Sequence, residues 1–420
     1  MRYLYTFLLA IATSFIFFRW LWRSRKVPGY RQRWTERLGY VSVQNNVSSI
    51  WIHAVSVGEF IAATPLIKAL LEEYPTHTIW VTTTTPTGSS QVIKQFSDQV
   101  QHTYVPIDLP SAVNRFLARC RPALCIIMET ELWPNLIYHT HARSIPILLA
   151  NARLSERSCR GYQRIAKLTR QMLANITLVA AQSEKDGEQF VRLGLDRKKL
   201  MVAGNIKFDL CLPPSLLAEG KQLRSSWGNR PTIIAASTHE GEESIILNAF
   251  TAIQKKYSTA LLLLVPRHPD RFDKVAKLCL AKGFRIAHRS MKQLPDQKTD
   301  ILLGDTIGEL RLLYAASDIA LVGGSLLPVG GHNLIEPAAL RLPILSGTHL
   351  HNFVAISQLL KEADAMILVE NETDIIDAVT QLLENKSFSD AMGQRAFGVS
   401  AANTGALGRH LQWIRKINTV

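Results

Sequence analysis

Charged side chains follow several short apolar runs in this sequence, and their positions suggest proton transfer. In "HAVSVGEF" (53–60), Gly58 and Glu59 open a helix that we expect at 58–73. A helix dipole favours the charged form of a carboxylate in the first turn, so we expect Glu59 to be ionised and able to accept a proton. An ordinary first-turn glutamate without a chemical role is the alternative.

Two more segments of the first half bring charges to the end of a strand. "METELWPN" (128–135) places Glu129 and Glu131 there, and "GNIKFD" (204–209) places Lys207 after a later strand. Arg153, in "NARLSERS", could join them, although a solvated surface position is the simpler interpretation. These residues supply charge of both signs at strand ends of the first half, with Lys207 on the linker side of the expected cleft.

The second half contains a glycine-rich segment, "GGSLLPVGGHNLIEPAAL" (323–340), directly after a strand that ends at Val322. Glycines let a ligand approach the backbone, and the free N–H groups of a helix starting near Asn333 attract phosphate. Glu336, in the first turn, could accept hydrogen bonds from the hydroxyls of a ribose. The alternative is a loop whose glutamate only caps its helix.

Three further strand exits carry polar residues in the same half. "LVPRHPDRF" (264–272) brings Arg267 and His268, while "GDTIGEL" (304–310) and "ASTHEGEE" (236–243) each precede a helix. The carboxyl ends of parallel strands lie at one edge of a sheet, where nucleotides bind. Together these exits predict a nucleotide site.

The elements that position these groups alternate between continuous apolar runs and helical stretches, which is typical of parallel strands buried on both faces. We expect strands at 49–55, 77–84, 102–106, 123–129, 145–151, 176–182 and 200–205, then at 232–237, 260–266, 300–305, 318–324, 342–347 and 365–370. Helical spans include 58–73 and 156–174. The pattern predicts an α/β fold with two Rossmann-like, doubly wound domains facing a cleft.

The alternation is interrupted once, by "CLPPSLLAEGKQLRSSWGNRP" (211–231), which is rich in proline, glycine and polar residues. We interpret it as a linker with a short helix. The predicted domains are therefore an N-terminal Rossmann-like domain at 30–210 and a C-terminal one at 232–420, with a separate segment at 1–23.

That first segment is predicted to be a membrane anchor. Tyr3 to Phe18 is uncharged, and the helix to Trp22 would span roughly 30 Å, about one hydrocarbon core. A cleaved signal peptide is the alternative, but its small-residue signal, Ala10 and Ala12, lies inside the apolar run. Seven basic residues against one acid between Arg19 and Arg37 predict a single-pass anchor with the catalytic body in the cytoplasm.

Composition limits the remaining possibilities. Hydrophobic residues make up 47% of the 420, and the formal charge of +14 favours anionic partners. No nucleic-acid module is recognisable, so we expect no nucleic-acid partner. The five cysteines, Cys120, Cys125, Cys159, Cys211 and Cys279, form no C-x-x-C pair, which predicts a reduced compartment without disulfides or a zinc site.

Taken together, "VSVGE", "ETELWPN", "NARLSERS", "GNIKFD", "VPRHPDRF" and "GGSLLPVGGHNLIEPA" resemble the 3-deoxy-D-manno-octulosonic acid (Kdo) transferases, over nearly the whole chain. The resemblance implies a GT-B glycosyltransferase that uses CMP-Kdo, with no cofactor and no metal at the reaction centre. It implies that Glu59 is the general base and that Glu129 and Lys207 support the transition state. The implied CMP contacts are Arg267, His268, Gly308, Glu309, Leu310, Asn333, Leu334, Ile335 and Glu336.

The implied reaction is an inverting transfer of Kdo from CMP-Kdo to a lipid A precursor, lipid IVA, in lipopolysaccharide core synthesis at the inner membrane. One carboxylate at the base position suffices for direct displacement, and the sequence has no D-x-D triplet of the kind that suggests metal-bridged diphosphate chemistry. Two alternatives stay open: another GT-B protein, such as a lipid A disaccharide synthase or a UDP-sugar epimerase, and a membrane-tethered binding module without activity.

Overall fold

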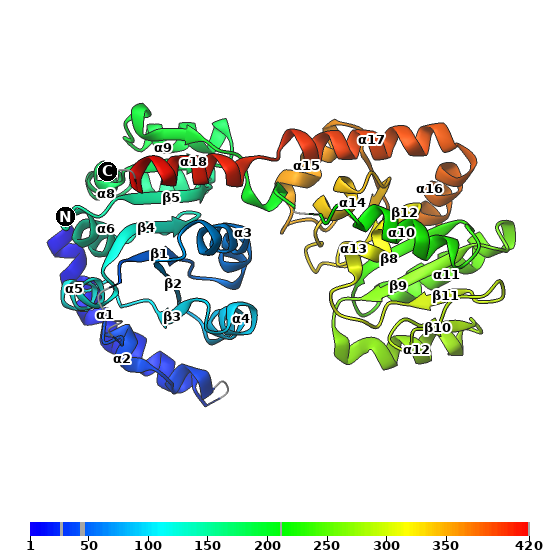
Figure 1. The fold of residues 1–420 in the computed structure, drawn as a ribbon, viewed down its shortest axis with the longest axis horizontal. Helices are drawn as coiled ribbons and strands as arrows, with labels where there is room; N and C mark the ends of the chain where they lie inside the picture. The colour runs from blue at the N-terminus through cyan, green and yellow to red at the C-terminus, as the bar shows by residue number, and fades with distance from the viewer. Residues whose placement is uncertain (26–27, 43–46, 211, 419–420) are drawn as a thin grey trace. The chain divides into compact units, whose positions relative to one another are not determined.

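The computed structural model describes residues 1–25, 28–42, 47–210 and 212–418, which form two compact units (Figure 1). The first unit comprises Met1–Asp209 and Thr404–Val420, and the second comprises Leu210–Asn403. Each unit is built on its own parallel sheet, and each is described by itself.

The sheet of the first unit has seven strands among the described residues, in the order β3-β2-β1-β4-β5-β6-β7. All neighbours are parallel. The strand order reverses between β1 and β4, and this switch point is where ligands bind in open α/β sheets. The strands are β1 (Ser49–His53), β2 (Thr78–Thr83), β3 (Gln101–Tyr104), β4 (Pro122–Met128), β5 (Ile147–Ala152), β6 (Leu178–Ala181) and β7 (Leu200–Val202).

Helices cover both faces of this sheet because alternate residues of each strand point to opposite sides. On β1, Ile50 and Ile52 pack with Phe60 of α3, whereas Trp51 lies 4.8 Å from Phe116 of α5, measured between ring centroids. The helices are α1 (Arg2–Arg23), α2 (Trp34–Arg37), α3 (Val57–Glu73), α4 (Pro86–Phe96), α5 (Pro110–Cys120), α6 (Pro134–His141), α7 (Glu156–Gln163), α8 (Ala166–Asn175), α9 (Glu184–Arg192), the 3-10 turn η3 (Ile206–Phe208) and α18 (Ala406–Asn418).

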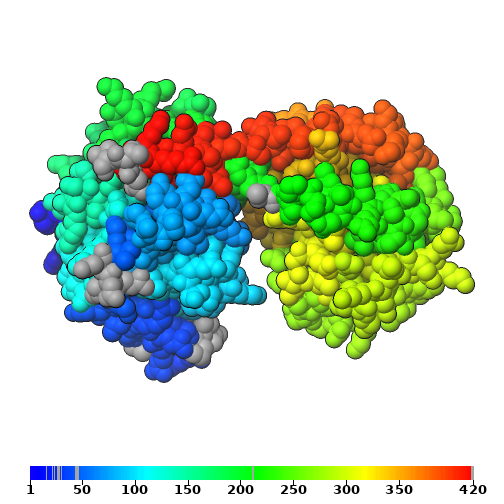
Figure 2. Space-filling view, in the orientation of Figure 1, coloured from blue at the N-terminus to red at the C-terminus, as the bar shows by residue number. Residues whose placement is uncertain are grey.

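The last of these helices, α18, returns to the first unit from the end of the chain. Leu411 and Ile414 are buried in the same apolar cluster as Phe60 of α3, and Arg415 pairs with Glu73. Figure 2 shows this red segment lying on the blue surface of the first unit. The sequence expectation placed all of 232–420 in one domain, and the structure instead groups Thr404–Val420 with the first unit.

The second unit has a sheet of seven described strands in the order β10-β11-β9-β8-β12-β13-β14, again all parallel. Its switch point lies between β8 and β12. The strands are β8 (Thr232–Thr238), β9 (Leu261–Pro266), β10 (Ile286–His288), β11 (Ile301–Leu303), β12 (Ile319–Val322), β13 (Ile344–Ser346) and β14 (Met366–Leu368). The helices are α10 (Leu216–Ser225), α11 (Glu242–Lys256), α12 (Phe272–Ala281), α13 (Leu310–Ala315), α14 (Ile335–Ala339), α15 (Val354–Glu362), α16 (Glu372–Glu384) and α17 (Lys386–Ala402).

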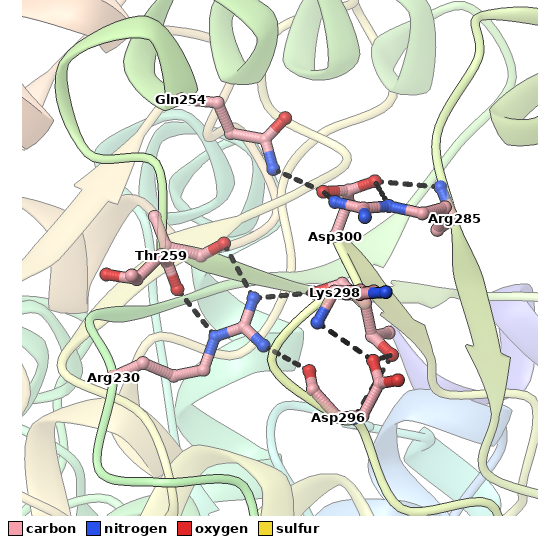
Figure 3. A network of polar contacts seen from close by, with 9 residues as sticks. Arg230, Gln254, Thr259, Arg285, Asp296, Lys298 and Asp300 are labelled. Atoms are coloured by element: carbon pink, nitrogen blue, oxygen red, sulfur yellow. Dashed lines mark hydrogen bonds and ion pairs between the residues drawn. The ribbon is translucent and has the colours of Figure 1, made fainter.

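A buried arginine ties together the amino ends of these strands (Figure 3). Arg230, which precedes β8, donates to the carbonyl oxygens of Thr259, Ala260, Asp296 and Thr299 at 2.5–3.1 Å. Arg285 and Gln254 both bind the Asp300 carboxylate beside it. This network lies at the edge opposite the strand exits, so it supports the sheet and leaves the other edge for ligands.

Several elements differ from the sequence expectation. The span 156–174 is two helices, α7 and α8, and the three-residue strand β10 was not foreseen. The predicted linker 211–231 contains α10, which belongs to the second unit, and residue 211, with its cysteine, lies outside the described residues. The four described cysteines are buried and unpaired.

The predicted N-terminal segment forms α1. Arg2–Trp20 is the one described helix with the length and composition to cross a membrane, with a mean hydropathy of 1.4. Of the basic cluster that follows it, Lys26 lies outside the described residues.

Candidate active site

Glu59 and Glu129 lie at the switch point of the first sheet. Glu59 is on α3, directly after β1, and Glu129 is the residue after β4. Because β1 and β4 are neighbours and parallel, both loops leave the sheet at the same edge. The chain therefore brings together two carboxylates that are 70 positions apart.

Glu59 is held in one orientation by a capping box at the start of α3. Ser56 caps the helix: its Oγ accepts a hydrogen bond from the Glu59 amide at 3.2 Å and donates to Glu59 Oε1 at 2.8 Å. The Val55 amide donates to Glu59 Oε2 at 2.8 Å. The side chain is only 7% exposed.

This burial makes Glu59 less ionised than the sequence predicted. Burial raises the pKa of the carboxyl to about 7, since the hydrogen bonds from Ser56 and Val55 offset only part of the cost, and Glu131 and Glu129 raise it further. The expectation of a low pKa was wrong because desolvation outweighs the helix dipole. A carboxylate with a pKa near neutral is nevertheless well matched to general-base work.

Glu129 and Lys207 form an ion pair beside Glu59. Lys207 Nζ lies 3.7 Å from Glu129 Oε1, and both side chains are partly exposed. Lys207 is on η3, whose first turn is capped by Asn205. Glu129 has a φ of 54°, a left-handed conformation that non-glycine residues adopt at a cost. Such strain is typical of functional sites.

A pocket of about 260 Å³ is lined by Glu59 and Glu129 together with five further residues. Glu131 lines it, and burial raises the pKa of its carboxyl, although Trp133 donates to it at 2.8 Å. Arg153, which the sequence interpretation left solvated, lines the same pocket. The remaining lining residues are Thr130, which directly follows a predicted strand and could have been found from that position, and Ser155 and Ser158 at the start of α7.

His53 is a further polar group that sequence reasoning missed. It is fully buried at the end of β1, its Nδ1 lies 3.0 Å from Thr82 Oγ1, and its Nε2 has no hydrogen-bond partner among the described residues. Burial lowers the pKa of the imidazole to about 3, so it is neutral at physiological pH.

The second unit gathers three histidines at its own switch point. His239 follows β8, His268 follows β9, and His332 lies in the glycine-rich segment after β12. The Nε2 atoms of His239 and His332 are 2.8 Å apart, and the rings of His239 and His268 are 5.3 Å apart. Burial, the neighbouring imidazoles and Arg267 lower the pKa of His332 to about 4. His332 is therefore neutral near pH 7, and the positive charge that follows β9 at this edge is that of Arg267.

The glycine-rich segment is organised differently from the sequence expectation. The buried Glu242 carboxylate accepts hydrogen bonds from the amides of Gly324, Ser325 and Leu326 at 2.7–3.0 Å. Those amides are therefore occupied. Gly323 is needed for packing, because a Cβ there would lie 2.8 Å from the Ser237 carbonyl oxygen. The helix predicted near Asn333 is α14, which begins at Ile335 and has five residues.

The other predicted nucleotide residues lie next to one another. Arg311, which follows Gly308, Glu309 and Leu310, donates to the Glu336 carboxylate at 3.0 Å. This contact joins that segment to Asn333, Leu334, Ile335 and Glu336. Arg267 and His268 meet the same segment through the histidine cluster. Glu309 pairs with Arg289 at 2.6 Å, so its side chain is already engaged. His239 and His332 were not predicted as site residues, although both stand in strand exits that the sequence identified.

Comparisons with known proteins identify the family of the chain. A family model described as 3-deoxy-D-manno-octulosonic-acid transferase (kdotransferase) matches residues 32–210. The chain is 45% identical to a 3-deoxy-D-manno-octulosonic acid transferase of Haemophilus influenzae, covering 99% of this chain and 98% of the relative. It is 36% identical to the transferase of the same name from Bordetella pertussis, covering 93% and 94%.

Among solved structures, the UDP-GlcNAc 2-epimerase from Neisseria meningitidis is similar in fold, with a TM-score of 0.57 and 18% identity, covering 88% of this chain and 100% of that one. Two parallel sheets with polar groups at both switch points, together with this likeness, define an α/β protein of the GT-B class. The full-length relatives take the assignment further. The chain belongs to the Kdo transferase family and is a glycosyltransferase.

Proposed function

We propose that this protein transfers Kdo from CMP-Kdo to a lipid A precursor, lipid IVA, with inversion at the anomeric carbon. The observation that carries the proposal is that Glu59 and Glu129 line one pocket, with Lys207 paired to Glu129, in a chain of the Kdo transferase family. No comparable observation favours the two alternatives, which are a UDP-sugar enzyme and an inactive binding module.

Glu59 acts as the general base. Its carboxylate takes the proton from a hydroxyl of the acceptor sugar, the acceptor oxygen attacks the anomeric carbon of Kdo, and the bond to the phosphate breaks with its electron pair leaving on CMP. The hydrogen bonds from Ser56 and Val55 keep the carboxylate aimed while a pKa of about 7 makes it basic enough for the task.

Glu129 and Lys207 stabilise charge in the transition state. Positive charge develops on the sugar as the bond to CMP breaks, and negative charge develops on the leaving phosphate. Both side chains of the pair are partly exposed, so a bound substrate can reach them. The pair itself contributes little to folding stability, so its two charges can separate at low cost to interact with the substrate. No metal or cofactor is assigned a role.

The second unit holds the nucleotide. Arg267 provides positive charge for the phosphate of CMP-Kdo, and His268 beside it offers a ring nitrogen for a hydrogen bond. Glu336, fixed by Arg311, is placed to accept hydrogen bonds from ribose hydroxyls. Gly308, Glu309, Leu310, Asn333, Leu334 and Ile335 supply backbone contacts along the same edge.

Location follows from the acceptor, which is an amphiphilic, phosphorylated glycolipid. We propose that the N-terminal segment holds the enzyme at the inner membrane with both units on the cytoplasmic side, supported by the apolar helix and the basic residues after it. Protease added outside intact cells is expected to leave the protein uncut, and cleavage there would reverse the orientation.

Mass spectrometry of the lipid acceptor tests the reaction directly. Purified enzyme, lipid IVA and CMP-Kdo are expected to give an acceptor heavier by one or more Kdo residues, with CMP released only when acceptor is present. Turnover with a UDP-sugar and none with CMP-Kdo would overturn the proposal in favour of another GT-B activity. CMP binding without any turnover would favour the binding module.

A further inference from the structure

The outer face of α1 is apolar apart from the exposed side chain of Ser14. Its large side chains at eight positions are more than half exposed. At 100° per residue these positions fall within an arc of about 140° that runs the length of the helix. They are Tyr3, Leu4, Phe7, Leu8, Ile11, Phe15, Phe18 and Trp22. An apolar surface of this size on one helix indicates a binding surface.

The opposite face of α1 is seated on the first unit by polar contacts at its N-terminal end. Arg2 and Thr6 both hydrogen-bond the fully buried Asn135 of α6, at 3.1 and 2.9 Å. The Arg2 guanidinium also lies 3.6 Å from the ring centroid of Tyr138. Asn135 in turn donates to the main-chain carbonyl of Asp108, so the seat is part of the interior of the unit.

The C-terminal end of α1 also packs against the first unit. Phe17 packs against Trp34 of α2 with ring centroids 5.3 Å apart, and the guanidinium of the buried Arg37 lies 4.2 Å from the Trp20 ring. From Arg2 to Trp20 the helix runs along one side of the unit for roughly 27 Å (Figure 1). It is therefore attached lengthwise and does not project from the unit.

The charge around α1 matches an anionic lipid surface. The first acidic residue of the sequence is Glu36, whereas Arg19, Arg25 and Arg31 are exposed at and beyond the C-terminal end of the helix. Arg19 lies at about 100° on the same helical scale, at the margin of the apolar arc. Apolar side chains flanked by arginines favour the boundary between acyl chains and anionic head groups.

We propose that α1 lies in the plane of the membrane surface, with its apolar face among the acyl chains of an anionic bilayer, and does not cross the bilayer. Crossing would require Arg2 and Thr6 to leave Asn135, which would cost the buried amide of that residue two hydrogen bonds, and would separate the Trp20 ring from the Arg37 guanidinium. This inference rests on the proposed membrane attachment but not on the transfer reaction. It places the whole length of α1 at one depth, with the body of the first unit on the water side of the helix.

Vesicle binding tests the surface. Full-length protein is expected to partition onto vesicles of phosphatidylethanolamine and phosphatidylglycerol more strongly than onto phosphatidylcholine, and the double variant Phe7→Ser/Phe18→Ser is expected to bind at least roughly tenfold more weakly. Ile93→Ser, which removes an exposed apolar side chain from α4 of the same unit, is the matched control and should bind normally. Unchanged binding of the double variant, or a change only in its oligomeric state, would overturn the lipid assignment.

Depth measurement separates the two modes of attachment. Spin labels at Leu4→Cys, Ile11→Cys and Phe18→Cys sample the two ends and the middle of the apolar face. A helix in the plane places all three labels at one depth, whereas a spanning helix places Ile11 about 10 Å deeper than Leu4 and Phe18. Equal depths support the inference, and a maximum at Ile11 contradicts it while leaving the attachment itself intact. Failure of the wild type to bind vesicles would instead remove the proposed attachment.

Discussion

Glu59 is subject to opposing influences at the scale of a single side chain. Burial disfavours its charge, while the Ser56 hydroxyl and the Val55 amide favour it, and the outcome is a pKa of about 7. Near neutral pH a substantial fraction of the protein therefore carries Glu59 in its ionised, proton-accepting form. Fewer hydrogen bonds would leave Glu59 protonated, and greater exposure would leave it too weak a base.

Replacing Glu59 by Gln should remove the base while keeping the capping contacts. The rate is expected to fall at least roughly 100-fold, with CMP affinity unchanged because the nucleotide residues are in the other unit. In the wild type, kcat/KM should rise as the pH passes upward through about 7, since the carboxyl must lose its proton to act. The residual activity of the variant should lack that rise. Wild-type turnover in Glu59→Gln would exclude the role.

Glu129 offers a way to separate strain from chemistry. Its left-handed φ of 54° is relieved by glycine but not by alanine, and both substitutions remove the carboxylate. We expect neither variant to turn over and Glu129→Gly to be more stable than Glu129→Ala by about 1 kcal/mol, as measured by urea denaturation. Equal stabilities would show that the backbone at this position is not strained.

At the scale of elements, the loops at the two switch points carry the proposed site residues. At the opposite edge of the second sheet, a hydrogen-bond network joins neighbouring strands (Figure 3). Arg230 binds four carbonyl oxygens at the amino ends of the strands in the second unit. Removing the Arg230 guanidinium would leave these buried carbonyl oxygens without their hydrogen-bond donor. They lie far from the proposed nucleotide residues, so we expect stability to fall while ligand binding is unchanged.

Arg230→Met is expected to lower the free energy of unfolding by about 3 kcal/mol while folded protein still binds CMP with wild-type affinity. Arg285→Met, in the same network but with a largely exposed side chain, is the control and should change stability little. Denaturant titration and calorimetric titration with CMP measure the two effects. Comparable losses in both variants would contradict a special role for the buried guanidinium.

Much of this element-level arrangement could be predicted because it is encoded locally. Continuous apolar runs such as the one ending at Met128 identify strands buried on both faces, and the polar residues after them must then lie at one edge. What could not be predicted depends on distant partners. The pKa of Glu59 depends on burial, which its own segment does not reveal. The amides of the Gly324 loop are bound by Glu242, 82 positions earlier.

At the scale of the whole chain, the position of α18 in the first unit is the feature that the sequence does not predict. Its helical pattern is evident, but nothing local shows that Leu411 and Ile414 pack with α3 of the first unit. His410, also buried, accepts a hydrogen bond from the Asn151 amide of β5 at 3.1 Å. The last helix therefore completes a core that begins near residue 50.

Deleting Thr404–Val420 should consequently damage the first unit and spare the second. The loss uncovers apolar side chains of α3, so we expect a lower unfolding midpoint for the first unit and loss of turnover, while CMP binding by the second unit persists. Hydrogen exchange read by mass spectrometry assigns the change to each unit. Faster exchange confined to the second unit would contradict the assignment of α18.

Because the first unit includes α18, it lacks one of its helices until the ribosome has synthesised residues 406–418. The second unit, made later, has all its own elements before the first one does. During most of its synthesis, the nascent chain therefore exposes the apolar side chains of α3 that α18 later covers. We expect a chaperone to bind the nascent chain at this surface.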